Sequence, residues 1–333
     1  MVRGKKTTLN DSKQSFVKRL TITFIVCILI FTTTLFLLDK FMNSVPMDKT
    51  ENGKDVDIAT LQNGPFDFSD VHSTLISGEG VFAAALKDIK RDNFLLIGNT
   101  DEGLSDTIML FSYDYESKLI DIISLPRDAY YPREGYTGSY NKLNAVFHDG
   151  PLATAQAVHE ILLGIPINNY FVIDYNGIEA IIDAIGGVPM LVEENMHYVS
   201  VPQDLYIDIP AGEQILDGKH AVQFLRFRKD GKGDLGRIER QQAFVKSAAT
   251  QALKGDLFSI AKTVMENVDS KISVKQLFFY SMAMVKVDTN NIRSHVIISE
   301  ETYIDGLSFT LLPNPDVLEQ QLRDIYQQSE IQE

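Results

Sequence analysis

The stretch NFLLIGNTDEGLSDTIMLFSYDYESKLIDIISLPRD, residues 93–128, decides the fold. It contains three apolar runs, Asn93–Gly98, Thr107–Tyr113 and Leu119–Leu125. Short apolar runs bounded by turn residues are typical of buried β-strands. The polar segment Tyr115–Lys118 suits a turn between the second and third runs, which predicts an antiparallel β-hairpin.

Predicted helices and strands alternate along the rest of the chain. Helices are predicted at Pro151–Leu163, at Gly177–Ile185, from the capping residue Asp217 to about Phe227, and at Ile238–Leu253, with strands at Tyr170–Ile173 and Val188–Val192. Gly164 and Gly186-Gly187 are expected to end the first two helices, because glycine readily adopts the left-handed conformation found after a helix. This alternation predicts a layered α/β fold, and the hairpin makes its sheet mixed.

Charge is distributed unevenly along the 333 residues. The whole chain has a net charge of −14, whereas the first 19 residues hold six basic side chains and one acidic side chain, a net charge of +5. The remainder therefore carries −19, which argues against nucleic acid as a partner, since that affinity comes mostly from cations that neutralise phosphates. The single cysteine, Cys27, excludes a disulfide framework and a multi-thiolate zinc site.

Leu20–Leu38 reads LTITFIVCILIFTTTLFLL and contains no charged residue. As a helix it would be about 28 Å long, close to the hydrocarbon thickness of a bilayer. The basic segment 1–19 predicts a cytoplasmic N-terminus. A cleaved signal peptide and a buried core helix are alternatives, but the length of the run and the charges after it favour a retained anchor.

The anchor divides the chain into four parts. Segment 1–19 is expected in the cytoplasm and segment 20–38 in the cell membrane, as a single-pass anchor. Residues 39–80 have mixed charge and little apolar periodicity, which predicts an extracellular tether. Residues 81–333 show no further linker and are expected to form one extracellular domain.

Arginines cluster in one part of this acidic domain. Arg226, Arg228, Arg237 and Arg240 fall within 15 positions. Arg226 and Arg228 would share a face of an extended stretch, and Arg237 and Gln241 would share a face of a helix. Guanidinium groups on two adjoining elements suit a pyrophosphate, and a solvated basic loop is the alternative.

Two further segments contain candidate ligand-binding residues. Arg127 follows the predicted strand Leu119–Leu125, and groups at the carboxyl ends of strands often bind ligands in α/β folds. An ion pair with Asp128 is the alternative. The loop Gly98–Thr107 contains several carboxylates that suit Mg²⁺, although a solvated acidic turn would look the same. These carboxylates are Asp101, Glu102 and Asp106.

A series of ordered motifs resembles the LytR–CpsA–Psr family of bacterial envelope proteins. The matching stretches lie between Asn93 and Gln242 and occur in the family's order: NFLLIG, SDTIML, IISLPRDAY, NKLNAVF, YFVIDYNGIEAIIDAIGGVPM, LDGKHAVQFLRFR and GDLGRIERQQ. The resemblance implies a three-layer α/β/α domain with a mixed central sheet. It also implies an apolar tunnel that holds a lipid.

The resemblance implies a phosphotransferase as well. Such proteins move a glycopolymer from a polyprenyl-pyrophosphate carrier to a cell-wall acceptor, usually a peptidoglycan sugar hydroxyl, and release polyprenyl phosphate. By match to the family motifs, the pyrophosphate would be held by Arg127, Arg226, Arg228, Arg237 and Gln241, with a further contact from Lys142. Asp106 would bind Mg²⁺, and Arg127 and Asp106 would take part in catalysis.

The loop after the first strand departs from the family pattern. Gly98 is followed by Asn99 and Thr100, where the family usually has an aspartate two residues after the glycine. The acid comes one position late, at Asp101, which we expect to serve as the second metal ligand. Leu104 stands where the family commonly has an arginine. Two functions follow: an active glycopolymer transferase, or a regulator that binds lipid pyrophosphate and turns over weakly.

Overall fold

The computed structural model describes residues 71–86, 89–99, 103–201, 205–227, 233–284 and 287–327. The expected anchor Leu20–Leu38, the basic segment 1–19 and most of the expected tether lie outside the described residues. Within these ranges, no helix is both long and apolar enough to cross a membrane.

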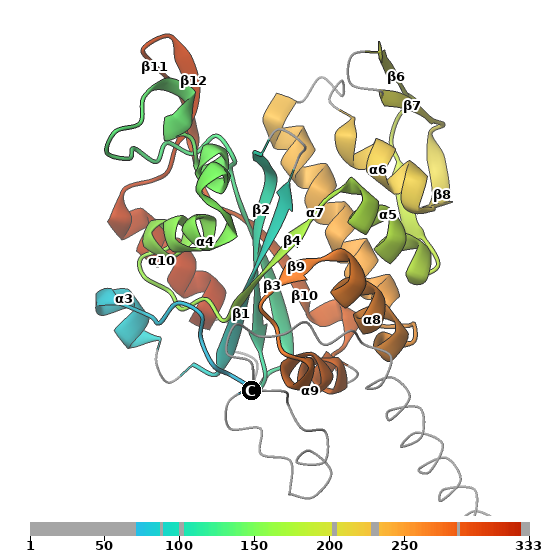
Figure 1. Ribbon diagram of the computed structural model, residues 1–333, viewed down its shortest axis with the longest axis horizontal. Coiled ribbons are helices and arrows are strands. Elements are labelled where there is room, and N and C mark those ends of the chain that lie inside the picture. Colours follow the sequence, from blue (N-terminus) through green and yellow to red (C-terminus); the bar gives the residue numbers. More distant parts are fainter. Residues whose placement is uncertain are drawn as a thin grey trace, which may run out of the picture. The chain divides into compact units, whose positions relative to one another are not determined.

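One mixed β-sheet forms the centre of the described domain (Figure 1). Its strands are β1 (Arg91–Asn99), β2 (Ser105–Asp114), β3 (Leu119–Leu125), β4 (Asn169–Ile173), β9 (Asp269–Ser270) and β10 (Ile292–Val296), in the order β10-β3-β2-β1-β4-β9. β1, β2 and β3 form an antiparallel meander. β4 joins parallel to β1, and β10 joins parallel to β3, so the predicted mixed sheet is confirmed.

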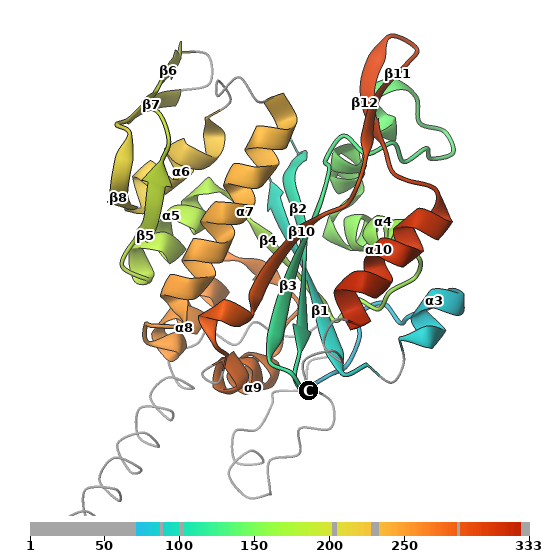
Figure 2. The ribbon, with the colours of Figure 1, turned by 180° about the vertical axis from the view of Figure 1, so that it is seen from behind.

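Helices cover both faces of this sheet, which gives three layers (Figures 1 and 2). On one face lie α3 (Gly80–Ala85), α4 (Pro151–Ile161) and α10 (Pro315–Gln327), and on the other lie α7 (Gly233–Ala252) and α9 (Val274–Met284). Successive side chains of each strand point to opposite faces of the sheet, so each strand contributes to a hydrophobic core on both faces. Leu95 and Ile97 of β1 are fully buried in the first core, whereas Leu96 packs against the second.

A third hydrophobic cluster lies beside α7. It is built from α5 (Tyr175–Ala184), α6 (Gly218–Arg226), α8 (Leu257–Asn267), the strand pair β5 (Val188–Val192) and β8 (Gly212–Leu216), and the strand pair β6 (Met196–Ser200) and β7 (Leu205–Ile209). Val188 and Ile207 are completely buried there. Phe244 of α7 belongs to the same cluster, so α7 joins this lobe to the central sheet.

Local signals in the sequence set several element boundaries. Asp174 caps α5 by accepting a hydrogen bond from the Gly177 amide at 2.7 Å, and Asp217 caps α6 by accepting one from the His220 amide at 2.9 Å. α5 ends before Gly186 and Gly187, whose φ angles are +80° and +86°. The predicted cap at Asp217 and the glycine stop after α5 are both confirmed.

The segment around Arg127 is bound on two sides. The hairpin of β11 (Glu300–Ile304) and β12 (Leu307–Leu311) lies beside it, and the Tyr130 amide donates to the Thr310 carbonyl at 2.9 Å. Two short 3₁₀ helices follow in the chain, η1 (Gly138–Asn141) and η2 (Leu143–Asp149). The Asn144 amide of η2 donates to the Arg127 carbonyl at 2.9 Å, which fixes the backbone after β3.

Residues at the end of the expected tether pack on the domain. Val71 is fully buried, and the Ile76 amide donates to the Ile167 carbonyl at 2.9 Å. The Glu79 amide donates to the Gly164 carbonyl at 2.9 Å. The compact domain therefore includes residues before 81.

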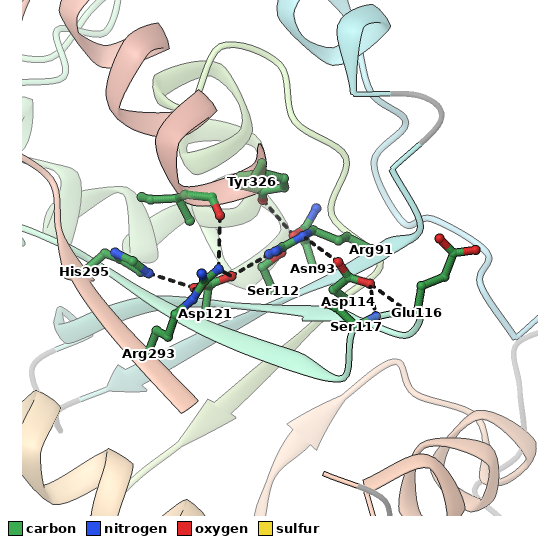
Figure 3. Close-up of polar contacts among 11 residues, drawn as sticks. Arg91, Asn93, Ser112, Asp114, Glu116, Ser117, Asp121, Arg293, His295 and Tyr326 are labelled. Atoms are coloured by element: carbon green, nitrogen blue, oxygen red, sulfur yellow. Dashed lines mark hydrogen bonds and ion pairs between the residues drawn. The ribbon is translucent and has the colours of Figure 1, made fainter. Parts of the chain in front are cut away.

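A buried ionic cluster joins β1, β2, β3 and β10 beneath the end of α10 (Figure 3). Asp121 is completely buried and accepts hydrogen bonds from Arg91 Nη1 at 2.6 Å and Arg293 Nε at 2.7 Å, and its Oδ1 lies 2.7 Å from His295 Nε2. Burial alone would raise the pKa of Asp121, but the His295 and Arg293 hydrogen bonds and the Arg91 charge hold that pKa well below its ordinary value of 3.8. Arg91 begins β1, so the cluster lies at the opposite end of that strand from Gly98 and Asn99.

Candidate functional site

A small cavity of about 40 Å³ opens at the carboxyl ends of the parallel strands β1 and β4. Open α/β sheets commonly bind ligands at this edge. The lining residues come from both strands, from the start of β2, from α5, α6 and α7: Gly98, Asn99, Asp106, Thr107, Ile173, Tyr175, Ile178, Leu225, Arg226 and Gln241. The sheet thus brings four distant parts of the sequence to one place.

A second cavity adjoins the first and extends toward β3. It shares Asp106, Thr107 and Gln241 with the first cavity and adds Arg127 to the lining. Among the charged residues that line the two cavities in the described ranges, Arg127 and Arg226 face a single carboxylate, Asp106. Among the described residues, the charged groups that line the two cavities thus have a positive sum within a chain whose net charge is −14.

Asp106 and Arg127 are held together directly. Arg127 Nη1 donates a hydrogen bond to Asp106 Oδ1, and both side chains are about one-fifth exposed. Arg127 Nε also lies 3.7 Å from Asp128 Oδ2, and Asp128 Oδ1 lies 2.9 Å from Lys142 Nζ. The result is a row of alternating charges. Arg127 therefore lines the second cavity and also lies within ion-pair distance of Asp128, which was the alternative.

Arg226 reaches the cavity from the last turn of α6. Its guanidinium carbon lies 4.8 Å from the ring centre of Tyr175, the first residue of α5, so the ring supports the cation through its face. Arg226 is the last residue of α6, which confirms the predicted helix from Asp217 to about Phe227. The arrangement in which Arg226 and Arg228 would share a face of an extended stretch therefore does not apply to Arg226. Arg228 lies outside the described residues.

α7 contributes Gln241 to both cavities, and this side chain is only 9% exposed. Arg237 lies four residues earlier on the same helix, as predicted, although its side chain is outside the described part. Asp101 lies outside the described residues as well. The described structure thus brings together Asp106, Arg127, Arg226 and Gln241, with Lys142 linked to them through Asp128.

Sequence reasoning missed the separate role of Arg240. Arg240 Nη2 donates a hydrogen bond to the carbonyl oxygen of Phe227, and the guanidinium also lies 5.8 Å from the Phe227 ring centre. Phe227 directly follows α6, so Arg240 fixes the backbone between Arg226 and Arg228. Arg240 directly precedes Gln241 in the sequence, but this neighbour could not indicate where Arg240 points, because successive residues of a helix point in different directions.

Asn99 is the second residue that sequence reasoning undervalued. The β1–β2 register shifts between Gly98 and Asn99, and such bulges re-aim side chains near active sites. Asn99 Oδ1 is buried and has no hydrogen-bond partner among the described residues. It lines the same cavity as Asp106. A buried acceptor without a donor is costly unless a ligand satisfies it.

A metal ion in a protein is held by side chains that act as its ligands. Within the described ranges, no group of three or more histidine, cysteine, aspartate or glutamate side chains could hold a metal ion. Asp106 and Asn99 do provide a carboxylate and an amide oxygen, and hard oxygen donors of this kind suit a Mg²⁺ ion that keeps several waters and also contacts phosphate. The residues present therefore fit a metal that arrives with a phosphate ligand.

The fold and site together define an α/β/α protein with an arginine-lined cleft at the carboxyl ends of its strands. A family model described as the LytR_cpsA_psr family matches residues 47–324. The chain belongs to the LytR–CpsA–Psr family.

The similar proteins include one that is named as a transferase and one that is named as a regulatory protein. The Bacillus subtilis (strain 168) protein named polyisoprenyl-teichoic acid–peptidoglycan teichoic acid transferase TagV is 30% identical over 205 residues, which cover 57% of this chain and 52% of that protein. The Staphylococcus aureus (strain COL) protein named regulatory protein MsrR is 31% identical over 162 residues, which cover 48% of this chain and 46% of that protein. The chain thus spans about half the length of these relatives.

The fold of the described domain also matches solved structures. The crystal structure of B. subtilis TagV superposes with a TM-score of 0.59 at 24% sequence identity, covering 73% of this chain and 98% of the TagV chain. At this level of identity the match concerns the fold. It agrees with the mixed sheet and the two helical layers described above.

Proposed function

We propose that this protein transfers a glycopolymer from a polyprenyl-pyrophosphate carrier to a peptidoglycan sugar hydroxyl and releases polyprenyl phosphate. One observation supports this most strongly: Arg127, Arg226 and Gln241, from three separate elements, line adjoining cavities around Asp106. Guanidinium groups that converge in this way suit a bidentate phosphate ligand. The family relationship and the printed name of the TagV relative support the same reaction.

The reaction exchanges the phosphoanhydride bond of the carrier pyrophosphate for a phosphoester bond to the acceptor. The acceptor hydroxyl oxygen attacks the phosphorus that bears the saccharide, a new P–O bond forms, and the bond to the bridging pyrophosphate oxygen breaks. Polyprenyl phosphate leaves with that oxygen. Negative charge builds up on the departing phosphate, and Arg127 and Arg226, which line the cavities, would stabilise it. The hydroxyl proton must pass to a base, and Asp106 is the carboxylate that lines both cavities.

Mg²⁺ is part of the proposal. When bound, the ion would polarise the phosphoryl oxygens and offset their charge. Asp106 and Asn99 Oδ1 would hold it among the described residues, with Asp101 as the expected additional ligand from the neighbouring loop. Arg127 already binds the Asp106 carboxylate, so Asp106 can bind a metal well only if this ion pair loosens.

We also propose that the N-terminal segment Leu20–Leu38 anchors the protein in the cell membrane, with residues 1–19 in the cytoplasm and the α/β/α domain outside. The apolar run and the basic residues before it support this orientation. A membrane anchor would hold the cleft near its lipid-linked substrate, which raises the effective concentration of that substrate.

A regulator that binds lipid pyrophosphate without efficient transfer is the second candidate. The ion pair between Arg127 and Asp106 supports it, because that pair reduces the availability of the one described carboxylate in the cleft. Leu104 in place of the arginine common in the family has the same implication. The name of the MsrR relative is consistent with this role.

A transfer assay separates the two candidates. The full-length chain in detergent is mixed with a polyprenyl-pyrophosphate oligosaccharide, uncrosslinked peptidoglycan strands and Mg²⁺, and released polyprenyl phosphate is measured. A transferase releases it only when the acceptor is present. Tight binding of the carrier without release, while an active family member turns over in parallel, would support the regulator instead.

A further inference from the structure

Three exposed aromatic rings form a ladder beside the cleft. The ring centres of His148 and Tyr140 lie 5.8 Å apart, and those of Tyr140 and Tyr136 lie 6.2 Å apart, with interplanar angles of 46° and 43°. All three residues are exposed, Tyr140 by 51% and Tyr136 by 37%. We call His148, Tyr140 and Tyr136 the aromatic ladder. Exposed tyrosines in one row are a feature of ligand-contacting surfaces.

The inner end of the ladder lies against the loop that leads into the cleft. A Cβ atom on Gly103 would lie only 3.2 Å from His148 Nδ1, so the histidine ring packs directly on this glycine. Gly103 precedes Asp106 by three residues. η2, which carries His148, is also tied to the cleft through Asn144, whose amide donates to the Arg127 carbonyl at 2.9 Å.

The outer end of the ladder is held in place by charged side chains. The Arg133 guanidinium carbon lies 3.9 Å from the Tyr136 ring centre, and Arg133 Nη1 donates a hydrogen bond to Asp149 Oδ2. The Tyr136 hydroxyl donates to Asp149 Oδ1 at 3.0 Å, and Arg133 Nη2 donates to the Tyr140 carbonyl at 2.8 Å. These bonds position the rings in advance, which lowers the entropic cost of binding a ligand on them.

We propose that the aromatic ladder binds sugar rings of the acceptor glycan and directs one of its hydroxyls toward the phosphorus beside Arg127. This inference rests on the proposed transfer to a peptidoglycan sugar. The faces of aromatic rings carry partial negative charge, which complements the C–H bonds on the apolar face of a sugar. Arg133, Asp149 and the Tyr136 hydroxyl supply polar groups at the ring edges for sugar hydroxyls.

Charge assigns this surface to the acceptor rather than to the carrier. Arg133 and Asp149 bind each other, so the charged pair beside the ladder is neutral as a whole. The cations suited to pyrophosphate, Arg127 and Arg226, lie in the cavities instead. A carrier held there leaves the ladder open to a second, neutral sugar chain that enters from the Gly103 side.

Direct binding tests the proposal without requiring transfer. The full-length chain in detergent is titrated calorimetrically with a soluble, uncrosslinked peptidoglycan oligosaccharide, and separately with the polyprenyl-pyrophosphate oligosaccharide. The variants are Tyr140→Ala, Tyr140→Phe and the control Tyr206→Ala. Tyr206 of β7 is matched to Tyr140, because it is 58% exposed and its ring centre lies 6.3 Å from that of His197.

The expected result is specific to the ring of Tyr140. Tyr140→Ala should weaken binding of the glycan about tenfold, whereas Tyr140→Phe and Tyr206→Ala should leave it within about twofold. The affinity for the polyprenyl-pyrophosphate oligosaccharide should be the same in the intact protein and in all three variants. In the transfer assay, Tyr140→Ala should raise KM for the acceptor and leave kcat at saturating acceptor unchanged.

Two outcomes would overturn the inference, and a third would overturn the proposed transferase function alone. Equal glycan binding by Tyr140→Ala and the intact protein would show that the ladder does not bind the acceptor glycan. Weaker carrier binding by Tyr140→Ala would assign the ladder to the donor saccharide. In the third case, the intact protein shows no transfer, and its binding of the glycan still depends on Tyr140. The aromatic ladder would then be confirmed as a glycan-binding surface, and the proposed transferase function would be wrong.

Discussion

Arg127 and Asp106 are bonded across the cleft, with Arg127 Nη1 as the donor and Asp106 Oδ1 as the acceptor. One residue follows β3 and the other lies at the start of β2, so the antiparallel pairing of these strands brings them together. A pyrophosphate that binds Arg127 must share this guanidinium with Asp106 or displace the carboxylate. We therefore expect this ion pair to couple the proposed binding of pyrophosphate to the proposed binding of Mg²⁺.

Removal of Arg127 should impair turnover. Arg127→Ala is expected to lower kcat about 10²-fold or more, because it removes a cation aimed at the charge that develops in the transition state. The measurement is initial release of polyprenyl phosphate at saturating carrier. Arg323→Ala is the control, since Arg323 pairs with Glu319 on α10 and this partly exposed pair is expected to contribute little. Equal rates for the two variants would remove Arg127 from the site.

Asp106 should control the metal requirement. Asp106→Asn is expected to raise the Mg²⁺ concentration for half-maximal activity at least tenfold, because it weakens the one described carboxylate that lines both cavities. Asp101→Ala should shift the Mg²⁺ requirement in the same direction, and Glu102→Ala should not. An unchanged Mg²⁺ titration in Asp106→Asn would contradict the proposed metal position.

The buried cluster around Asp121 should make stability depend on acid pH. The folded-state pKa of Asp121 is lowered, so its contribution is complete above the ordinary pKa of 3.8 and is lost progressively as the pH falls below that value. Chemical unfolding at several pH values measures this. Asp121→Asn should lower the free energy of unfolding by about 3–5 kcal/mol at neutral pH, because it removes the buried carboxylate that pairs with both Arg91 and Arg293.

The pH slope distinguishes this role from simple loss of packing. Below pH 4, the intact protein should lose stability more steeply than Asp121→Asn. Asp217→Asn is the control. The hydrogen bond from the His220 amide also lowers the pKa of Asp217, but the Asp217 side chain is largely exposed, whereas that of Asp121 is buried. A parallel pH dependence of the intact protein and Asp121→Asn would exclude Asp121 as the titrating group.

Gly164 and Gly186 provide a matched test of how the segment before α3 is held. Both have a φ of +80°, so alanine costs about 1–3 kcal/mol of backbone strain at either position. A Cβ on Gly164 would also lie 2.0 Å from the Glu79 carbonyl oxygen, whereas one on Gly186 meets no atom within 4 Å. Gly164→Ala should therefore be the more destabilising change and should expose residues 75–79 to proteases. Similar Tm values for the two variants would contradict this packing.

The central strands were predictable because each is a short apolar run between turn residues. β3 has the predicted bounds Leu119–Leu125, and β5 has the predicted bounds Val188–Val192. Asp217 marks a helix start through a local hydrogen bond, and Gly186 marks a helix end through its backbone conformation. Both effects depend on the residue type itself, so they could be predicted from the sequence. The hairpin strands β6, β7, β11 and β12 were not predicted from the sequence. Their half-exposed residues depend on cross-strand partners that sequence order does not reveal.

Which arginines face the cleft also depends on tertiary structure. Arg226 and Arg240 belong to one dense cluster in the sequence, yet only Arg226 lines the cavity, while Arg240 donates to the Phe227 carbonyl. The buried oxygen of Asn99 follows from a register shift between β1 and β2. Neither position could be assigned from residue spacing, because each depends on how separate elements meet.

The phosphate content of the product tests the central claim most directly. Peptidoglycan strands are incubated with the full-length chain, the carrier-linked oligosaccharide and Mg²⁺, digested with a muramidase and analysed by mass spectrometry. The account predicts an adduct of one saccharide plus one phosphate per modified sugar, since the bond broken is the one between phosphorus and the bridging oxygen. An adduct without phosphate, or no adduct while the carrier is bound, would contradict it.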